Sequence, residues 1–167
     1  MSFMEHELAE PIAVMSDVCG VAELLRQAIV LVIEDGLRLS SAFEEVCDFL
    51  DISVERIGSH FDLAGALGAF RPMAVAAEFD CRGMDGGHVL MAVASHDRSL
   101  PVLLLTGGDS AMEGAADAVE ELWQLTAVAK WAEIGGPGRM VDFLLHAGRA
   151  GRCLRQAPLW PAGSLRH

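Results

Sequence analysis

The sequence has few positive charges. Its 12 lysines and arginines stand against 24 aspartates and glutamates, which gives a formal net charge of −12 and a pI near 4.7. Non-specific binding to nucleic acid or to an anionic membrane requires a positive field. We therefore expect neither nucleic acid nor a membrane as a partner. The basic residues are also unevenly placed, because residues 149–167 contain four arginines and no acidic side chain.

The sequence also lacks the motifs of zinc, redox and targeting sites. Its four cysteines form no C-x-x-C pair and its six histidines show no H-E-x-x-H spacing, so we expect neither a zinc site nor a redox motif. The N-terminus lacks the basic region of a secretory signal, and the longest strongly apolar run, AIVLVI at 28–33, is too short to cross a bilayer. These absences predict a cytoplasmic protein with reduced thiols.

The sequence does contain an alternation of apolar runs and amphipathic segments. Continuous β-branched and apolar runs are typical of strands that are buried on both faces, whereas apolar residues at helical spacing predict helices. The expected strands are 28–33, 52–58, 73–79, 100–106 and 125–131. The expected helices are 37–51, 63–70, 88–95, 109–123 and 138–154. This alternation predicts an α/β fold with a parallel sheet and helices on both faces.

The chain divides into three expected parts. Residues 1–27 form an N-terminal extension, in which the pattern of residues 16–27 predicts a short helix. Residues 28–150 form one domain, and a hydrophobic fraction of 52% allows it a sizeable core. Residues 151–167 are broken by prolines and form a C-terminal tail.

Polar residues stand at or just after the carboxyl ends of four of the predicted strands. They are Glu34, Asp35, Glu78, Thr106 and Lys130. In a parallel sheet the functional crevice lies beyond the carboxyl ends of the strands, so we expect these side chains to converge. Carboxylates that lie close together repel one another and need a cation or a proton, and their hard oxygens suit Mg²⁺. A metal, a lysine and a hydroxyl group together can hold a phosphoryl group.

In this order the residues resemble the receiver domain of two-component response regulators, over residues 28–150. That family has an acidic pair after the first strand, a phosphoaccepting aspartate at the end of the third, a serine or threonine at the end of the fourth and a lysine at the end of the fifth. The resemblance implies a flavodoxin-like (βα)5 doubly wound sheet with the strand order 2-1-3-4-5. It also implies a signalling partner, which would be a histidine kinase, a phosphotransferase or a downstream effector.

The resemblance assigns roles to single residues. Glu78, Thr106 and Lys130 would handle the phosphoryl group. Glu34 and Asp35 would hold Mg²⁺ together with the backbone carbonyl of Asp80. The sequence leaves open whether the metal binds.

Four departures from the family pattern indicate an atypical receiver. The turn Met84-Asp85-Gly86 matches the family and places Glu78 at the phosphoacceptor position, where a glutamate is one methylene longer than aspartate. Its phosphate would be misplaced, and productive geometry tolerates an error of only about 1 Å. Arg82 and Trp131 replace customary prolines, and Ala127 replaces an aromatic residue.

Three functional hypotheses remain at this point. The first is a stand-alone, non-enzymatic signalling module that needs no phosphorylation and acts by protein–protein contact. Its contact face would be formed by residues 109–150, which include the acidic residues Asp117, Glu120 and Glu121. We expect no output domain after the last helix. The sequence does not decide whether the chain forms a homodimer. The second is a conventional Mg²⁺-dependent receiver that uses Asp80 as the acceptor. The third is a Mg²⁺-dependent phosphoryl-transfer enzyme of flavodoxin-like fold.

Overall fold

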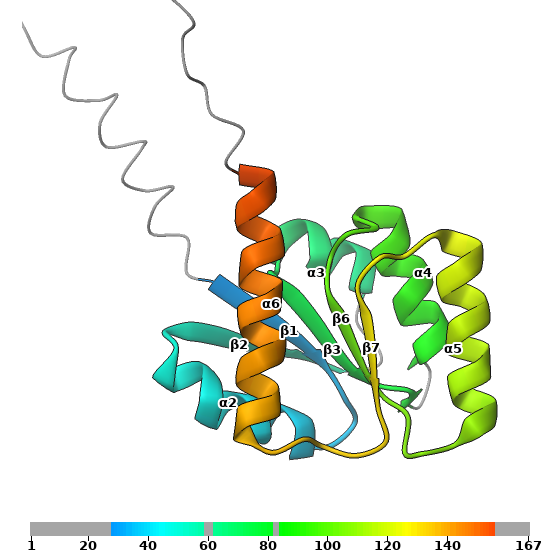
Figure 1. Ribbon diagram of the computed structural model, residues 1–167, viewed down its shortest axis with the longest axis horizontal. Helices are drawn as coiled ribbons and strands as arrows, with labels where there is room; N and C mark the ends of the chain where they lie inside the picture. The colour runs from blue at the N-terminus through cyan, green and yellow to red at the C-terminus, as the bar shows by residue number, and fades with distance from the viewer. Residues whose placement is uncertain (1–27, 59–61, 82–83, 156–167) are drawn as a thin grey trace, which may run out of the picture.

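A computed structural model describes residues 28–58, 62–81 and 84–155 of the chain. Five parallel strands form one sheet in the order β2-β1-β3-β6-β7 (Figure 1). They are β1 (Ala28–Ile33), β2 (Ile52–Ile57), β3 (Ala74–Glu78), β6 (Val102–Leu105) and β7 (Val128–Trp131). Counted without the short strands β4 and β5, this is the order 2-1-3-4-5. The expected flavodoxin-like fold is confirmed.

Helices cover both faces of the sheet, as expected for a doubly wound fold (Figure 1). One face carries α2 (Arg38–Phe49) and α6 (Pro137–Arg155), and the other carries α3 (Leu63–Phe70), α4 (Gly86–His96) and α5 (Ser110–Trp123). Helix α6 continues beyond residue 150, where we expected the domain to end. The helix expected at 16–27 lies outside the described residues. No helix in the described ranges is long and apolar enough to cross a membrane.

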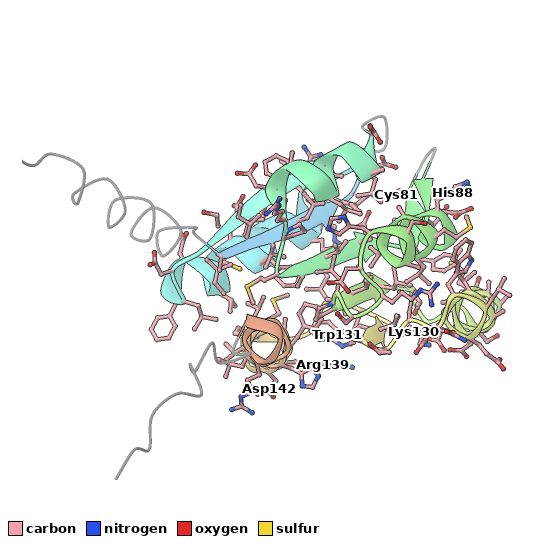
Figure 2. All side chains as sticks on the ribbon, turned by 90° about the horizontal axis from the view of Figure 1, so that it is seen from above. Cys81, His88, Lys130, Trp131, Arg139 and Asp142 are labelled. Carbon is pink, nitrogen blue, oxygen red and sulfur yellow. The ribbon has the colours of Figure 1, made fainter. Side chains whose placement is uncertain are left out.

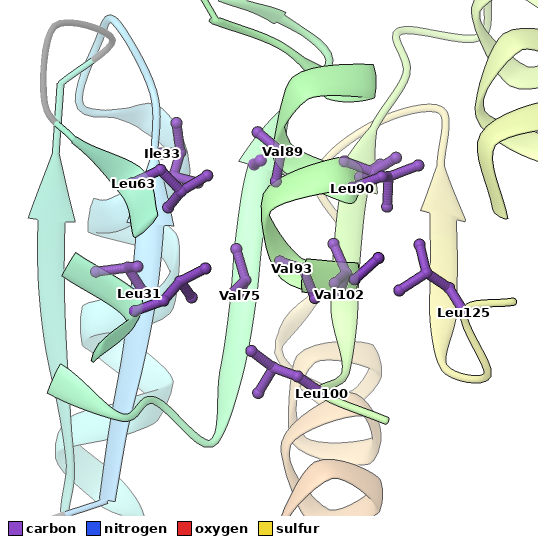
Figure 3. Packing of buried hydrophobic residues seen from close by; sticks show 14 of the residues in the cluster. Leu31, Ile33, Leu63, Val75, Val89, Leu90, Val93, Leu100, Val102 and Leu125 are labelled. Atoms are coloured by element: carbon purple, nitrogen blue, oxygen red, sulfur yellow. The ribbon is translucent and has the colours of Figure 1, made fainter. Parts of the chain in front are cut away.

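The apolar run of β1 shows why the sheet is buried on both sides. Successive side chains of a strand point to opposite faces. Leu31 and Ile33 accordingly pack into the layer under α3, α4 and α5 (Figure 3), whereas Val30 and Val32 pack into the layer under α2 and α6. All four side chains are fully buried. A continuous apolar run is therefore the pattern that this strand requires.

The segment after β3 differs from the expectation. Asp80–Cys81 (β4) and Met84–Asp85 (β5) form a small antiparallel ribbon that the sequence did not predict. Helix α4 begins earlier than residue 88, because the carboxylate of Asp85 accepts the backbone N–H of His88 at 2.9 Å and caps the helix. This bond is the main reason that the pKa of Asp85 is lowered.

Gly86 has a specific steric role in this turn. A Cβ atom at this position would lie 2.4 Å from Cδ2 of Phe79. The backbone N–H of Gly86 also donates to the carbonyl of Phe79 at 2.8 Å. The glycine of the MDG turn therefore allows the ring of Phe79 to pack over the start of α4.

Two phenylalanines of α2 provide a matched test of the core. Phe43 is fully buried and its ring contacts Phe143 edge to face, whereas Phe49 is 87% exposed. Phe43→Ala should lower the free energy of unfolding by about 3–5 kcal/mol, because it leaves a cavity. Phe49→Ala should change it by no more than about 0.5 kcal/mol. Urea denaturation of both variants measures the difference, and equal losses would contradict this packing.

Candidate functional site

The carboxyl ends of β1, β3 and β6 meet at one edge of the sheet. Ile33 is level with Ala77, and Glu78 is level with Leu105. Glu34 therefore follows β1 at the point where Glu78 ends β3. The structure also places Asp35 at this edge. The charges of Glu34 and Asp35 both raise the pKa of the Glu78 carboxyl group.

Glu34 is a buried residue that caps a helix. Its side chain is completely inaccessible to solvent. One oxygen accepts the backbone N–H of Leu39 at 2.8 Å, and the other accepts the N–H of Ser40 at 3.1 Å and the Ser40 hydroxyl. The Nε of Arg56, from β2, lies 3.4 Å from that second oxygen. The carboxylate thus satisfies the first amides of α2, and the positive end of the helix and Arg56 together balance its charge.

Glu34, one of the expected Mg²⁺ ligands, has its carboxylate engaged by protein donors in this arrangement. Both oxygens of Glu34 are already used by protein donors, and its burial separates it from solvent. Asp35 and Asp80 are exposed. Within the described ranges no three His, Cys, Asp or Glu side chains are grouped so that they could hold a metal ion.

Glu78 lies where the sequence placed it, at the end of β3, and it is partly buried. Burial is the largest cause that raises the pKa of its carboxyl group, followed by the charge of Glu34. The charge of Arg38 and a backbone hydrogen bond from Asp35 act in the opposite direction. The charge of Arg38 in α2 thus offsets the raised pKa of Glu78 only in part.

Lys130 does not reach Glu78. Its ammonium group donates to Glu120 at 2.7 Å and to Asp117, and both acceptors belong to α5. Figure 2 shows Lys130 on the side of α5, while Trp131 lies toward Arg139 of α6. The side chain of Lys130 therefore lies on the other face of the sheet from the carboxylates of Glu34 and Glu78.

The register of β7 explains this placement. Leu105 is level with Glu78 on one side and with Trp131 on the other. Trp131, rather than the lysine before it, points into the layer of α2 and α6, where it is buried against Phe143 with ring centroids 6.2 Å apart. A difference of one residue in register moves a side chain to the opposite face.

The hydroxyl group of Thr106 also bonds to groups other than Glu34 and Glu78. Its side chain is only 2% exposed. The hydroxyl lies 3.0 Å from Oε1 of Glu113 in α5 and 3.2 Å from the carbonyl of Trp131, and it accepts the N–H of Gly108 at 3.4 Å. One hydroxyl proton and two acceptors leave Thr106 with no spare donor.

Asp80 lies beyond the end of β3, in the β4–β5 ribbon, where its backbone is level with that of Asp85. Cys81 beside it is buried, with Sγ 3.8 Å from the carbonyl of Ile33. Burial is the main cause that raises the pKa of Cys81 to about 11, so its sulfur stays protonated.

Sequence reasoning missed the residues that partner the expected site. Arg56 is level with Val32 near the end of β1, so the predicted strand order could have indicated it. Arg38 and Glu113 lie in the first turns of the helices that follow Glu34 and Thr106. Their contacts depend on side-chain directions that a sequence pattern does not carry.

Comparison with solved structures identifies the fold. The chain is similar to the chemotaxis response regulator CheY4 of Vibrio cholerae, with 20% identity and a TM-score of 0.58 over 72% of this chain and 98% of that one. It is also similar to the receiver domain of a sensor histidine kinase from Pseudomonas aeruginosa, solved with a magnesium ion coordinated in its active-site cleft, with 14% identity and a TM-score of 0.60 over 73% and 98% of the two chains. No protein-family model and no curated protein matches the sequence. The fold is that of receiver domains.

The cap formed by Glu34 predicts a large effect of a small substitution. Glu34→Gln places an amide NH₂ or a neutral oxygen opposite two backbone amides and Arg56. We expect a loss of about 2–4 kcal/mol in the free energy of unfolding, because buried donors and a buried charge contact are disrupted. Glu45→Gln, on the exposed side of α2, is the matched control and should change it by about 0.5 kcal/mol or less. Urea denaturation that shows equal effects would refute the capping role.

Glu78 predicts a dependence of stability on pH. Because the pKa of its carboxyl group is raised above the ordinary value of 4.5, the folded chain binds more protons than the unfolded chain between the two pKa values. Ionisation of Glu78 therefore lowers stability as the pH rises through that window. Glu78→Gln should be more stable than the parent chain at pH 7 and equal to it below pH 4.5. Urea denaturation across this range measures the difference. A gain that does not vary with pH would show that packing, not charge, causes it.

Proposed function

We propose that this chain is an atypical receiver-like signalling module that works without being phosphorylated. It would act in two-component signal transduction by contact with another protein, and not as an enzyme. The receiver fold supports the signalling role. The contacts of the expected site residues support the independence from phosphorylation.

The observation that carries the proposal is that three of the residues expected to handle the phosphoryl group or its metal, Glu34, Thr106 and Lys130, are bonded to other protein groups. Lys130 is paired with Asp117 and Glu120, and the hydroxyl of Thr106 lies against Glu113. Glu34 is buried as a helix cap. A phosphoryl group on Glu78 would find no lysine, hydroxyl or metal to neutralise its charge, and such neutralisation is the main contribution of a protein to phosphoryl transfer.

Glu78 supports the proposal in a second way. It places a carboxyl group at the phosphoacceptor position and on a longer side chain than an aspartate. That group is present without the action of any kinase, so the chain would hold one signalling state. Its partner would be a histidine kinase, a phosphotransferase or a downstream effector that recognises this state.

Acetyl phosphate with Mg²⁺ tests the proposal directly. Transfer would form an acyl phosphate on a carboxylate oxygen and release acetate. We expect intact-mass measurement of the full chain to show no added phosphoryl group, while a conventional receiver treated in parallel is labelled. A stable adduct that disappears in Glu78→Ala would overturn the proposal. An adduct that disappears only in Asp80→Asn would identify Asp80 as the acceptor of a conventional receiver.

Glu78→Asp tests whether the length of the side chain alone prevents phosphorylation. If the extra methylene alone prevented phosphorylation, this variant would be labelled by acetyl phosphate. We expect it to stay unlabelled, because Lys130, Thr106 and Glu34 keep their internal partners. Labelling of Glu78→Asp at the rate of a conventional receiver would show that these contacts open readily.

A further inference from the structure

Two of the residues expected at the phosphoryl site bond to the same helix. Thr106, after β6, contacts Glu113, and Lys130 of β7 contacts Asp117 and Glu120. We propose that these five residues form a carboxylate latch that holds α5 in one position without a phosphoryl group. The inference rests on the proposed function and deepens it, because it names the element whose position would be fixed for a partner.

The spacing of the three acids supports a shared role. Glu113, Asp117 and Glu120 occur at positions i, i+4 and i+7 and so lie along one side of α5. Like charges four residues apart destabilise an isolated helix. Their position becomes favourable only where donors face them, and here Thr106 and Lys130 supply those donors from the ends of two neighbouring strands.

Helix α5 packs beside α4, but few of its side chains are fully buried. Its one fully buried residue is Ala116, and Val119 and Trp123 are only partly buried against the core. Leu122 is 77% exposed. Apolar burial is the usual source of helix docking. Since α5 has fewer buried side chains than α4, polar contacts at its first and middle turns carry more weight than they would in α4.

The three contacts of the latch differ in burial. Thr106 is almost completely buried, whereas the side chain of Lys130 is 23% exposed and its partners Glu120 and Asp117 are 30% and 64% exposed. Burial lowers the pKa of Lys130, but the hydrogen bonds to Asp117 and Glu120 outweigh it, so that the pKa is raised overall. The lysine therefore stays charged and paired at neutral pH.

Hydrogen exchange of the full chain, read by mass spectrometry, tests the latch. Glu113→Ala and Glu120→Ala should each speed the exchange of α5 amides by about tenfold, as expected for the loss of a hydrogen bond to a charged group that holds a local element. Glu121→Ala is the matched control, because it removes the same charge from the next position of the same helix and no described contact. It should leave the exchange of α5 unchanged. The amides of α2 report on global stability.

The outcomes separate the two proposals. The latch would be overturned if α5 exchanged as slowly in Glu113→Ala and Glu120→Ala as in Glu121→Ala. It would also be overturned if exchange in α2 accelerated as much as in α5, because that would indicate global destabilisation. Glu113→Gln keeps an oxygen acceptor for Thr106 and should restore the slow exchange. Failure of the latch leaves the acetyl phosphate result unaffected, whereas labelling by acetyl phosphate would refute the proposed function whatever the exchange of α5.

Discussion

The register of β7 against β6 decides what the carboxyl edge of this sheet can do. Leu105 is level with Trp131, so the tryptophan points into the layer of α2 and α6 and Lys130 points to α5. Because strand residues alternate between faces, these two placements are inseparable. The edge therefore contains the carboxylates of Glu34 and Glu78 but not the ammonium group of Lys130. Lys130 instead bonds to Asp117 and Glu120 of α5.

The remaining charges at this edge are balanced from within the protein. Glu34 is neutralised by the amino end of α2 and by Arg56, and the charge of Arg38 acts on Glu78. Buried or half-buried carboxylates need such partners when no metal supplies the positive charge. The contacts that stabilise the start of α2 thus occupy both oxygens of Glu34, which was one of the expected Mg²⁺ ligands.

The sequence predicted the fold well because apolar runs report burial directly. Strand β1 and helix α3 have the expected bounds, and the MDG turn placed Glu78 correctly at the end of β3. The candidate site was harder to predict. Spacing along the chain indicated which strand carries Lys130, but not which face its side chain takes. The resemblance assigned Glu34 to Mg²⁺, whereas its capping bonds depend on how α2 follows β1, which no local motif encodes.

A double-mutant cycle on Lys130 tests the central claim most directly. The coupling free energy between Lys130→Met and Glu120→Gln, from urea denaturation, should be at least about 0.5 kcal/mol, as for side chains in contact. The coupling between Lys130→Met and Glu78→Gln should be zero within error. A larger coupling to Glu78 than to Glu120 would show that the lysine occupies the phosphoryl pocket, and would contradict the account.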